Sequence, residues 1–431
     1  MIGVGEVHRL TVDDFERLAS ARPGAAALDV LRRSQFSRRL LTLRSVAALG
    51  RERFPVQWRA AGAEPAWELL EAVDRTERRA LEAVLMHPPV GVLLARCLRR
   101  LTGQPQDGSD LERDLARLGA LAVGAALRAR LPVSLRLPVH GDRLALPGWG
   151  VARLPSGTSA VRVEGAVLSA PGFSAEPRTP GAVDPPAGAP GWLPLRALAL
   201  PPSAAASDLP ALRLTLEDGD PDRHNPGARS APRLTTHQLG EWEDSLGGAW
   251  ELLTEHFPDR ATVCAALCTC VVPLTPPPGG WASSASREAF GAIWLSPTND
   301  TARLAEALVH EVSHVVLGAL GDMVDLHDPD HADSYTVGWR SDPRPLGAVL
   351  QGTYAHVARL AFWDRYRRVA RTAEADRAER HHRLLRGQVL DALELLDGCT
   401  GLTALGRRFC DRMAAGVMPR PGHMTPRYSN G

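Results

Sequence analysis

The chain has 431 residues, 44% of them hydrophobic and 23% charged, and it is long enough for two or three domains with hydrophobic cores. Fifty basic residues nearly balance 49 acidic ones, and this balance gives no indication of nucleic acid or a membrane as a partner. Every basic residue is arginine, which excludes lysine Schiff-base chemistry. The N-terminus lacks a signal-peptide pattern and no apolar window approaches ~18 residues, so a cytoplasmic location is expected.

The first two regions differ in their hydrophobic periodicity. Residues 1–130 contain helical periodicity with few breakers, as in ALDVLRRSQFSRRLLTLRSVAAL, and are predicted to form an α-helical N-terminal domain. Residues 131–215 contain short alternating runs such as VSLRLPV and LRLTL between Pro and Gly residues. This second pattern predicts a small β-rich middle region with an exposed loop near 175–192.

Residues 216–431 are predicted to form a mainly helical, metal-binding catalytic domain with a short sheet, which gives an α+β, predominantly helical fold overall. A turn is expected at 218–223, followed by a helix over about 235–257 with Trp242, Leu246, Trp250 and Leu253 on one side. The runs VCAALCTCVVPL and AFGAIWLS predict two strands. Three further helices are predicted over 345–370, 373–397 and 401–415.

Two features of these predicted strands allow alternative interpretations. The strand FGAIWLS either presents an edge on which an extended peptide pairs or is a core strand. The cysteines at 264, 268 and 270 either bind a metal or are buried structural thiols, and their apolar setting favours buried thiols.

An HExxH motif, His310-Glu311-Val312-Ser313-His314, lies in an apolar periodic stretch bounded by Asn299-Asp300 and Gly321. On a helix, residues four apart share a face, so His310 and His314 are predicted to bind one metal ion with Glu311 beside it. The extended HExxHxxGxxH form is excluded because positions 317 and 320 are leucines.

A third ligand must therefore come from another segment. His356 on the following helix is the preferred candidate, although a lone histidine on an apolar helix face is normally a core residue. Competing donors on the intervening loop are His327, Asp328, Asp330 and His331, which also fit a solvated turn.

Arg340 and Arg344 flank Ser341-Asp342-Pro343 at the entry to the His356 helix. They are either solvated turn residues or a bidentate clamp for a carboxylate near the metal. The clamp would fit an organic acid as cosubstrate.

Several segments together resemble a known family: SSASREAFGAIWLS, LAEALVHEVSHVVLGAL, WRSDPRPLGAVLQGTYAHVARLAFW, EDGDPDR and LDVLRRSQFSRRLLTLRSV. They resemble the HExxH-motif proteins associated with ribosomally synthesised, modified peptides, which are understood as 2-oxoglutarate-dependent peptide β-hydroxylases. The likeness covers most of the chain, and the stretch DPRPLxG…YAHxA…FW is more specific than HExxH alone.

The resemblance implies iron(II) rather than zinc, with His310 and His314 as ligands, a zincin-like active helix, Glu311 as a neighbouring or acid/base group, and Arg340 or Arg344 as the clamp for 2-oxoglutarate. It implies a precursor peptide as substrate and a maturase from the same biosynthetic cluster as a possible partner. Iron with three protein ligands keeps positions for a keto acid and dioxygen.

Two other functions remain open from the sequence. In a zinc endopeptidase, Glu311 would be the general base for a metal-bound water, and this is what HExxH most often indicates. A peptide-binding scaffold with a lost metal site is the third alternative, but the intact motif argues against it.

Overall fold

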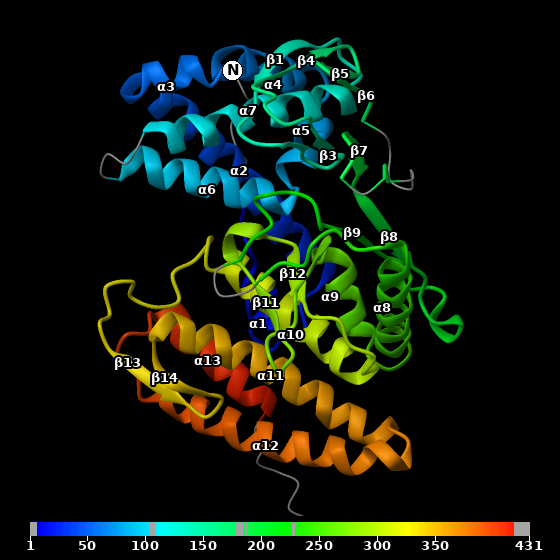
Figure 1. The fold of residues 1–431 in the computed structure, drawn as a ribbon. Helices are drawn as coiled ribbons and strands as arrows, with labels where there is room; N and C mark the ends of the chain where they lie inside the picture. Colours follow the sequence, from blue (N-terminus) through cyan, green and yellow to red (C-terminus); the bar gives the residue numbers. More distant parts are fainter. Residues whose placement is uncertain (1–6, 104–107, 178–183, 187, 226–228, 418–431) are drawn as a thin grey trace, which may run out of the picture.

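A computed structural model describes residues 7–103, 108–177, 184–186, 188–225 and 229–417. These residues form a mixed α+β fold (Figure 1). The described part of the chain contains thirteen α-helices and four small sheets. The predicted α+β class is confirmed. The loop expected near 175–192 falls partly on 178–183 and 187, which lie outside the described residues.

The upper part of the molecule in Figure 1 combines five helices with two antiparallel sheets, ordered β1-β4-β5-β6 and β2-β3-β7. The helices are α3 (Pro55–Ala60), α4 (Ala63–Thr76), α5 (Arg78–Leu85), α6 (Pro88–Thr102) and α7 (Gly108–Arg128). The strands are β1 (Ser134–Pro138), β2 (Arg143–Leu146), β3 (Gly150–Arg153), β4 (Ala160–Glu164), β5 (Val167–Ala170), β6 (Phe173–Ala175) and β7 (Gly191–Pro194).

The lower part contains a five-stranded mixed sheet, a hairpin and the remaining helices (Figure 1). Its strands are β8 (Arg196–Leu200), β9 (Leu212–Leu216), β10 (Cys270–Pro273), β11 (Ser283–Ala285), β12 (Ala292–Leu295), β13 (Ser334–Val337) and β14 (Arg340–Pro345). Its helices are α1 (Val12–Ala19), α8 (Thr236–His256), α9 (Pro258–Leu267), α10 (Thr301–Leu320), α11 (Leu346–Val369), α12 (Thr372–Asp397) and α13 (Ala404–Val417). The helix predicted over 235–257 and the three predicted C-terminal helices are confirmed.

Helix α2 (Ala25–Arg53) runs through both parts. Its first turns contribute Leu28 and Leu31 to a buried cluster that continues with residues 198–413, and its later turns contribute Leu40 and Leu43 to a second cluster that extends to residue 192. One helix therefore packs in two hydrophobic cores. The division at residues 130 and 215 stays a prediction.

The five-stranded sheet, ordered β11-β12-β10-β9-β8, provides the surface on which α10 packs. Parallel pairing of β9, β10 and β12 buries the central strands on both faces. Alternate residues point to opposite faces, so Val271 and Ile293 join the cluster of α10 while Val272 and Trp294 join a small cluster on the other face.

One prediction about this sheet is corrected, and one open alternative is decided. The run VCAALCTCVVPL is not one strand, because Pro258 begins helix α9 and its Ala- and Leu-rich part continues that helix through Leu267. The strand FGAIWLS does not present an edge, because β12 pairs with β10 on one side and β11 on the other. It is a core strand, and the terminal strand on that side is β11.

Among the described residues, no single helix combines the length and apolarity of a membrane span. Helices α5 and α6 meet these criteria only as a pair, and they are bent by 79° relative to one another.

The turn expected at 218–223 carries three buried acidic side chains, and Glu217 directly before it supplies a fourth. Glu217, Asp218, Asp220 and Asp222 are each less than 5% exposed. Their partners come from separate elements: Asp218 pairs with Arg196 and Arg233, Asp220 with Arg117, Asp222 with Arg96 and Arg117, and Glu217 with His87. These ion pairs connect α6 and α7 to the segment that follows β9.

We predict that Asp218→Ala destabilises the protein by about 3 kcal/mol, because it removes the buried carboxylate that Arg196 and Arg233 share and leaves them only Asp184, whose side chain is 28% exposed. Asp342→Ala is the matched control, since Asp342 also pairs with two arginines but its side chain is 51% exposed. The control should change stability by less than about 0.5 kcal/mol. Urea denaturation measures both, and equal effects would contradict the role of burial.

Candidate metal centre

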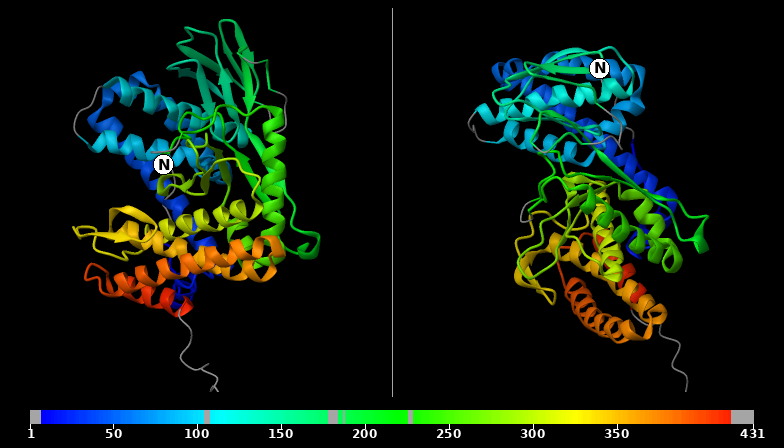
Figure 2. Two further views of the ribbon diagram at one scale, coloured as in Figure 1. Left: turned by 60° about the horizontal axis from the view of Figure 1, so that its bottom comes forward. Right: turned by 45° about the vertical axis from the view of Figure 1, so that its right-hand side comes forward.

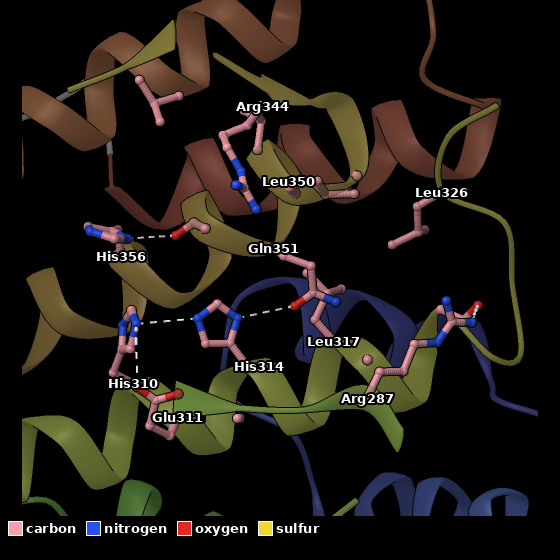
Figure 3. Close-up of a pocket in the computed structure, with 18 of the residues that line it drawn as sticks. Arg287, His310, Glu311, His314, Leu317, Leu326, Arg344, Leu350, Gln351 and His356 are labelled. Atoms are coloured by element: carbon pink, nitrogen blue, oxygen red, sulfur yellow. Dashed lines mark hydrogen bonds and ion pairs between the residues drawn. The ribbon is translucent and has the colours of Figure 1, made fainter. Parts of the chain in front are cut away.

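Helix α10 places His310 and His314 one turn apart on the same face, as the motif predicts. The helix begins at the N-cap Asp300, whose side chain accepts a hydrogen bond from the backbone of Arg303. Almost all other residues of α10 are buried, so its position against the sheet and α11 is fixed by packing. The two imidazoles are thereby held with their Nε2 atoms 3.3 Å apart (Figure 3).

Neighbouring polar groups orient the side chains of the motif. Nδ1 of His314 donates a hydrogen bond to Oε1 of Gln351 at 3.3 Å, so its Nε2 carries the lone pair. Glu311 is 2% exposed and accepts a hydrogen bond of 2.6 Å from Oγ of Ser283 on β11. Oε1 of Glu311 lies 3.9 Å from Nε2 of His310. The carboxylate is thus held beside the histidine pair.

The separation of the two nitrogen atoms fits one bound cation. Metal–nitrogen bonds of roughly 2.0–2.1 Å that meet at angles between octahedral and tetrahedral place the two nitrogens about 3.0–3.4 Å apart. In the described part of the chain, His310, Glu311 and His314 form a group that could hold a metal ion, with potential ligand atoms within 4.8 Å of one another. The donor set of two imidazoles and one carboxylate suits zinc or iron.

Burial shifts the protonation of all three residues. It lowers the pKa of His310 well below its ordinary value, with a contribution from His314, and it also lowers the pKa of His314. Burial raises the pKa of Glu311 to about 7, against the opposing hydrogen bond from Ser283. Neutral imidazoles are the form that binds metals, and a carboxyl group that titrates near neutral pH can act as an acid or a base.

His356 lies next to the pair but is turned away from it. The centroids of the His310 and His356 rings are 5.4 Å apart. Nδ1 of His356 donates to the carbonyl of Gly352 at 2.8 Å, and its Nε2 accepts from Nη1 of Arg359 at 3.2 Å. Its ring also stacks on Trp339 at 3.9 Å. Its role as third ligand stays a prediction, since its ring would have to leave Arg359 to reach the metal.

Arg340 and Arg344 lie on β14, at the rim of the same cavity. The turn interpretation is corrected, because the segment is a strand, although both side chains are at least partly exposed and pair with Asp342 on that strand. Figure 3 nevertheless shows the guanidinium of Arg344 directed into the cavity on the side opposite α10. The structure thus brings both arginines to the site, and their role as a carboxylate clamp stays a prediction.

The cavity has a volume of about 980 Å³ and is formed by α10, α11, β11 and the loop that includes the β13–β14 hairpin. Four arginines line it: Arg287, Arg340, Arg344 and Arg359. Sequence reasoning did not single out Ser283, Gln351, Arg287 or Arg359. The HExxH motif predicts only residues of the helix that contains it. These four residues lie on other elements and come to the site through tertiary packing.

Of the candidate ligands on the loop, one lines the cavity and the others have partners close by in the chain. His327 lines the cavity, whereas His331 donates to or accepts from the hydroxyl of Tyr335 at 2.7 Å, and Asp328 accepts from the backbone of Asp330 at 2.9 Å. The hydrogen bond between Asp328 and Asp330 closes a local turn. Cys264, Cys268 and Cys270 are buried, and burial raises the pKa of each thiol, so the expectation of buried thiols is confirmed.

No protein-family model matches the chain, and no curated protein matches it at a significant level. The geometry described above is therefore the basis of any functional assignment.

We predict that His356 makes the metal-free protein less stable in acid. Burial, with the charge of Arg359, lowers its pKa to about 3. Below an unfolded-state pKa of about 6.5, the unfolded chain binds the proton and the folded protein does not, so stability is lost as pH falls. Between pH 6 and pH 5, the free energy of unfolding should therefore fall by about 1 kcal/mol less in His356→Asn than in the wild-type protein. Urea denaturation with a chelator tests this, with the exposed His237→Asn as control, and identical slopes in the wild-type protein and His356→Asn would contradict it.

Proposed function

We propose that the protein is an iron(II)- and 2-oxoglutarate-dependent oxygenase that hydroxylates a β-carbon in a ribosomally made precursor peptide. The observation that carries the proposal is the cavity in which the histidine pair of α10 faces several arginines. A site for a metal alone does not require cationic side chains around it, but a site for a metal and an organic acid does. The sequence resemblance supplies the reaction class.

His310 and His314 would hold the metal, with His356 as the third ligand. Glu311 is the other candidate for that position, since its carboxylate lies in one group with the two histidines, although one of its oxygens accepts a hydrogen bond from Ser283. When bound, iron(II) with 2-oxoglutarate and dioxygen supplies an oxidant that removes hydrogen from an unactivated carbon and returns a hydroxyl group.

The chain's own residues would prepare the site for this chemistry. Gln351 fixes the ring of His314, and Ser283 holds Glu311 at a position from which it can accept or return a proton. Arg340 or Arg344 would bind the keto acid. Leu317, Leu326 and Leu350 line the cavity and exclude water from part of it.

The peptide would lie along β11, the terminal strand of the sheet beside the cavity. Ser283, Ser284 and Ala285 of this strand line the cavity, and the HExxH helix packs under the same mixed sheet in a zincin-like arrangement. Backbone pairing with such a strand is a common way to bind an extended peptide. The proposal also includes a cytoplasmic location and, as a partner, a maturase encoded in the same biosynthetic gene cluster.

A zinc endopeptidase is the second candidate, and one observation favours it. Glu311 is positioned next to His310 and its pKa is raised to about 7, as suits a general base for a metal-bound water. The arginines of the cavity have no role in this alternative, which is why we place it second.

Anaerobic addition of iron(II) and 2-oxoglutarate tests the proposal. We expect a weak visible charge-transfer band, because the keto acid chelates the metal in the ferrous site. Zinc-loaded protein with the same acid is the control and should show no band. Absence of the band with iron, together with peptide cleavage by the zinc form, would establish the endopeptidase instead.

Substitutions in the motif distinguish the residues that bind the metal from a residue that only lies beside it. His310→Ala and His314→Ala should abolish iron binding, because each removes one of two nitrogens that share the ion, whereas Glu311→Gln should bind iron within about threefold of the wild-type protein. Metal content after dialysis and titration calorimetry measure this. Equal loss in all three variants would make Glu311 a ligand.

A further inference from the structure

Arg359 lies on α11 one turn after His356 and lines the metal cavity. Its guanidinium is close to the histidines, since Nη1 is 3.2 Å from Nε2 of His356, whose ring lies 5.4 Å from that of His310. No residue of the HExxH motif supplies a cation at this position. Arg359 therefore places a positive charge beside the candidate ligands.

A buried carboxylate on the metal-binding helix fixes the position of Arg359. Nε of Arg359 donates to Oε1 of Glu306, which also accepts a hydrogen bond of 3.0 Å from Nε1 of Trp363. Glu306 is 8% exposed and lies four residues before His310 on α10. The ion pair thus joins α10 to α11 and holds the guanidinium at a set distance from the histidine pair.

The other edge of the guanidinium remains available to a ligand. An arginine has five N–H donors, and Glu306 and His356 account for two of them. Within the described part of the chain, Nη2 of Arg359 has no hydrogen-bond partner. Nη1 and Nη2 can together donate two hydrogen bonds to one carboxylate in bidentate geometry. A carboxylate oxygen can also replace Nε2 of His356 as the acceptor from Nη1.

The other three arginines of the cavity are less suited to hold a carboxylate beside the histidines. Since 2-oxoglutarate has two carboxylates, Arg340 or Arg344 stays the candidate for the second one. Arg287 pairs with Asp322, and Arg340 and Arg344 pair with Asp342. Their side chains are 58%, 52% and 38% exposed, against 27% for Arg359. A less exposed cation attracts an anion more strongly because water screens it less.

We infer that Arg359 binds a carboxylate group of a ligand beside the metal-binding histidines, and that Glu306 positions it. The inference rests on the proposed function, in which that ligand is the 2-oxoglutarate cosubstrate. It adds a residue that neither the motif nor the resemblance assigns.

Titration calorimetry of the full-length protein with one equivalent of zinc tests the inference, with 2-oxoglutarate and succinate as probes. Arg359→Gln should weaken binding of both acids by roughly tenfold or more, because a charged bidentate contact is lost. That variant also leaves Glu306 as an unpaired buried carboxylate. The double variant Glu306→Gln/Arg359→Gln removes this charge and serves as the folding control, checked by circular dichroism and thermal unfolding.

The double variant separates binding from structure. If Arg359 binds the anion, the double variant recovers thermal stability but not acid binding. Glu306→Gln alone retains binding, because its amide oxygen can still accept the hydrogen bond from Nε of Arg359, whereas Glu306→Ala weakens binding because Arg359 loses this partner. Recovery of binding in the double variant would overturn the inference, and so would unchanged binding in Arg359→Gln or a wild-type protein that binds neither acid. Arg344→Gln is the matched control for an exposed cavity arginine and should weaken binding less than Arg359→Gln; a larger loss in Arg344→Gln would also overturn the inference.

The two proposals fail in different ways. A wild-type protein that gives no charge-transfer band with iron but binds succinate through Arg359 contradicts the hydroxylase and supports the arginine assignment. A band that persists unchanged while Arg359→Gln binds both acids normally supports the hydroxylase and overturns the arginine assignment.

Discussion

The candidate site depends on one constraint: α10 is buried on nearly all sides, and its few polar residues must find partners inside the protein. Glu306 and Glu311 are buried and His314 is only partly exposed, so these three residues need partners within the protein, because unpaired buried polar groups are costly. Their partners come from β11 and α11, through Ser283, Gln351, Arg359 and Trp363. The same contacts that satisfy these groups also form the walls of the cavity.

The arrangement of α10, α11 and α12 explains why distant sequence positions meet in the cavity. Figure 2 shows the three helices lying side by side, with the β13–β14 hairpin at one end. The hairpin directs Trp339, Arg340 and Arg344 toward the same cavity that the helices line. The helices thus supply the histidines and the half-buried Arg359, whereas a shorter, more exposed hairpin supplies the outer arginines.

The sequence predicted the parts of the site that follow from local periodicity. The i, i+4 spacing of His310 and His314 and the apolar pattern around them specify a helix and a shared face, and the structure has both. Helix α8 and the C-terminal helices were predicted for the same reason. Short strands were harder, because an apolar run such as VCAALCTCVVPL fits a helix or a strand until tertiary pairing decides. Contacts such as Arg359 with Glu306, which join residues 53 positions apart, leave no pattern within a single segment.

Helix α2 limits how this protein can change during evolution. Its two halves are packed in different hydrophobic cores, so both cores depend on the position of this one helix. A shift of one turn in α2 would misplace apolar side chains at both ends of the molecule at once. Insertions and deletions within Ala25–Arg53 should therefore be rarer among its descendants than in the surrounding loops, although no site residue lies on that helix.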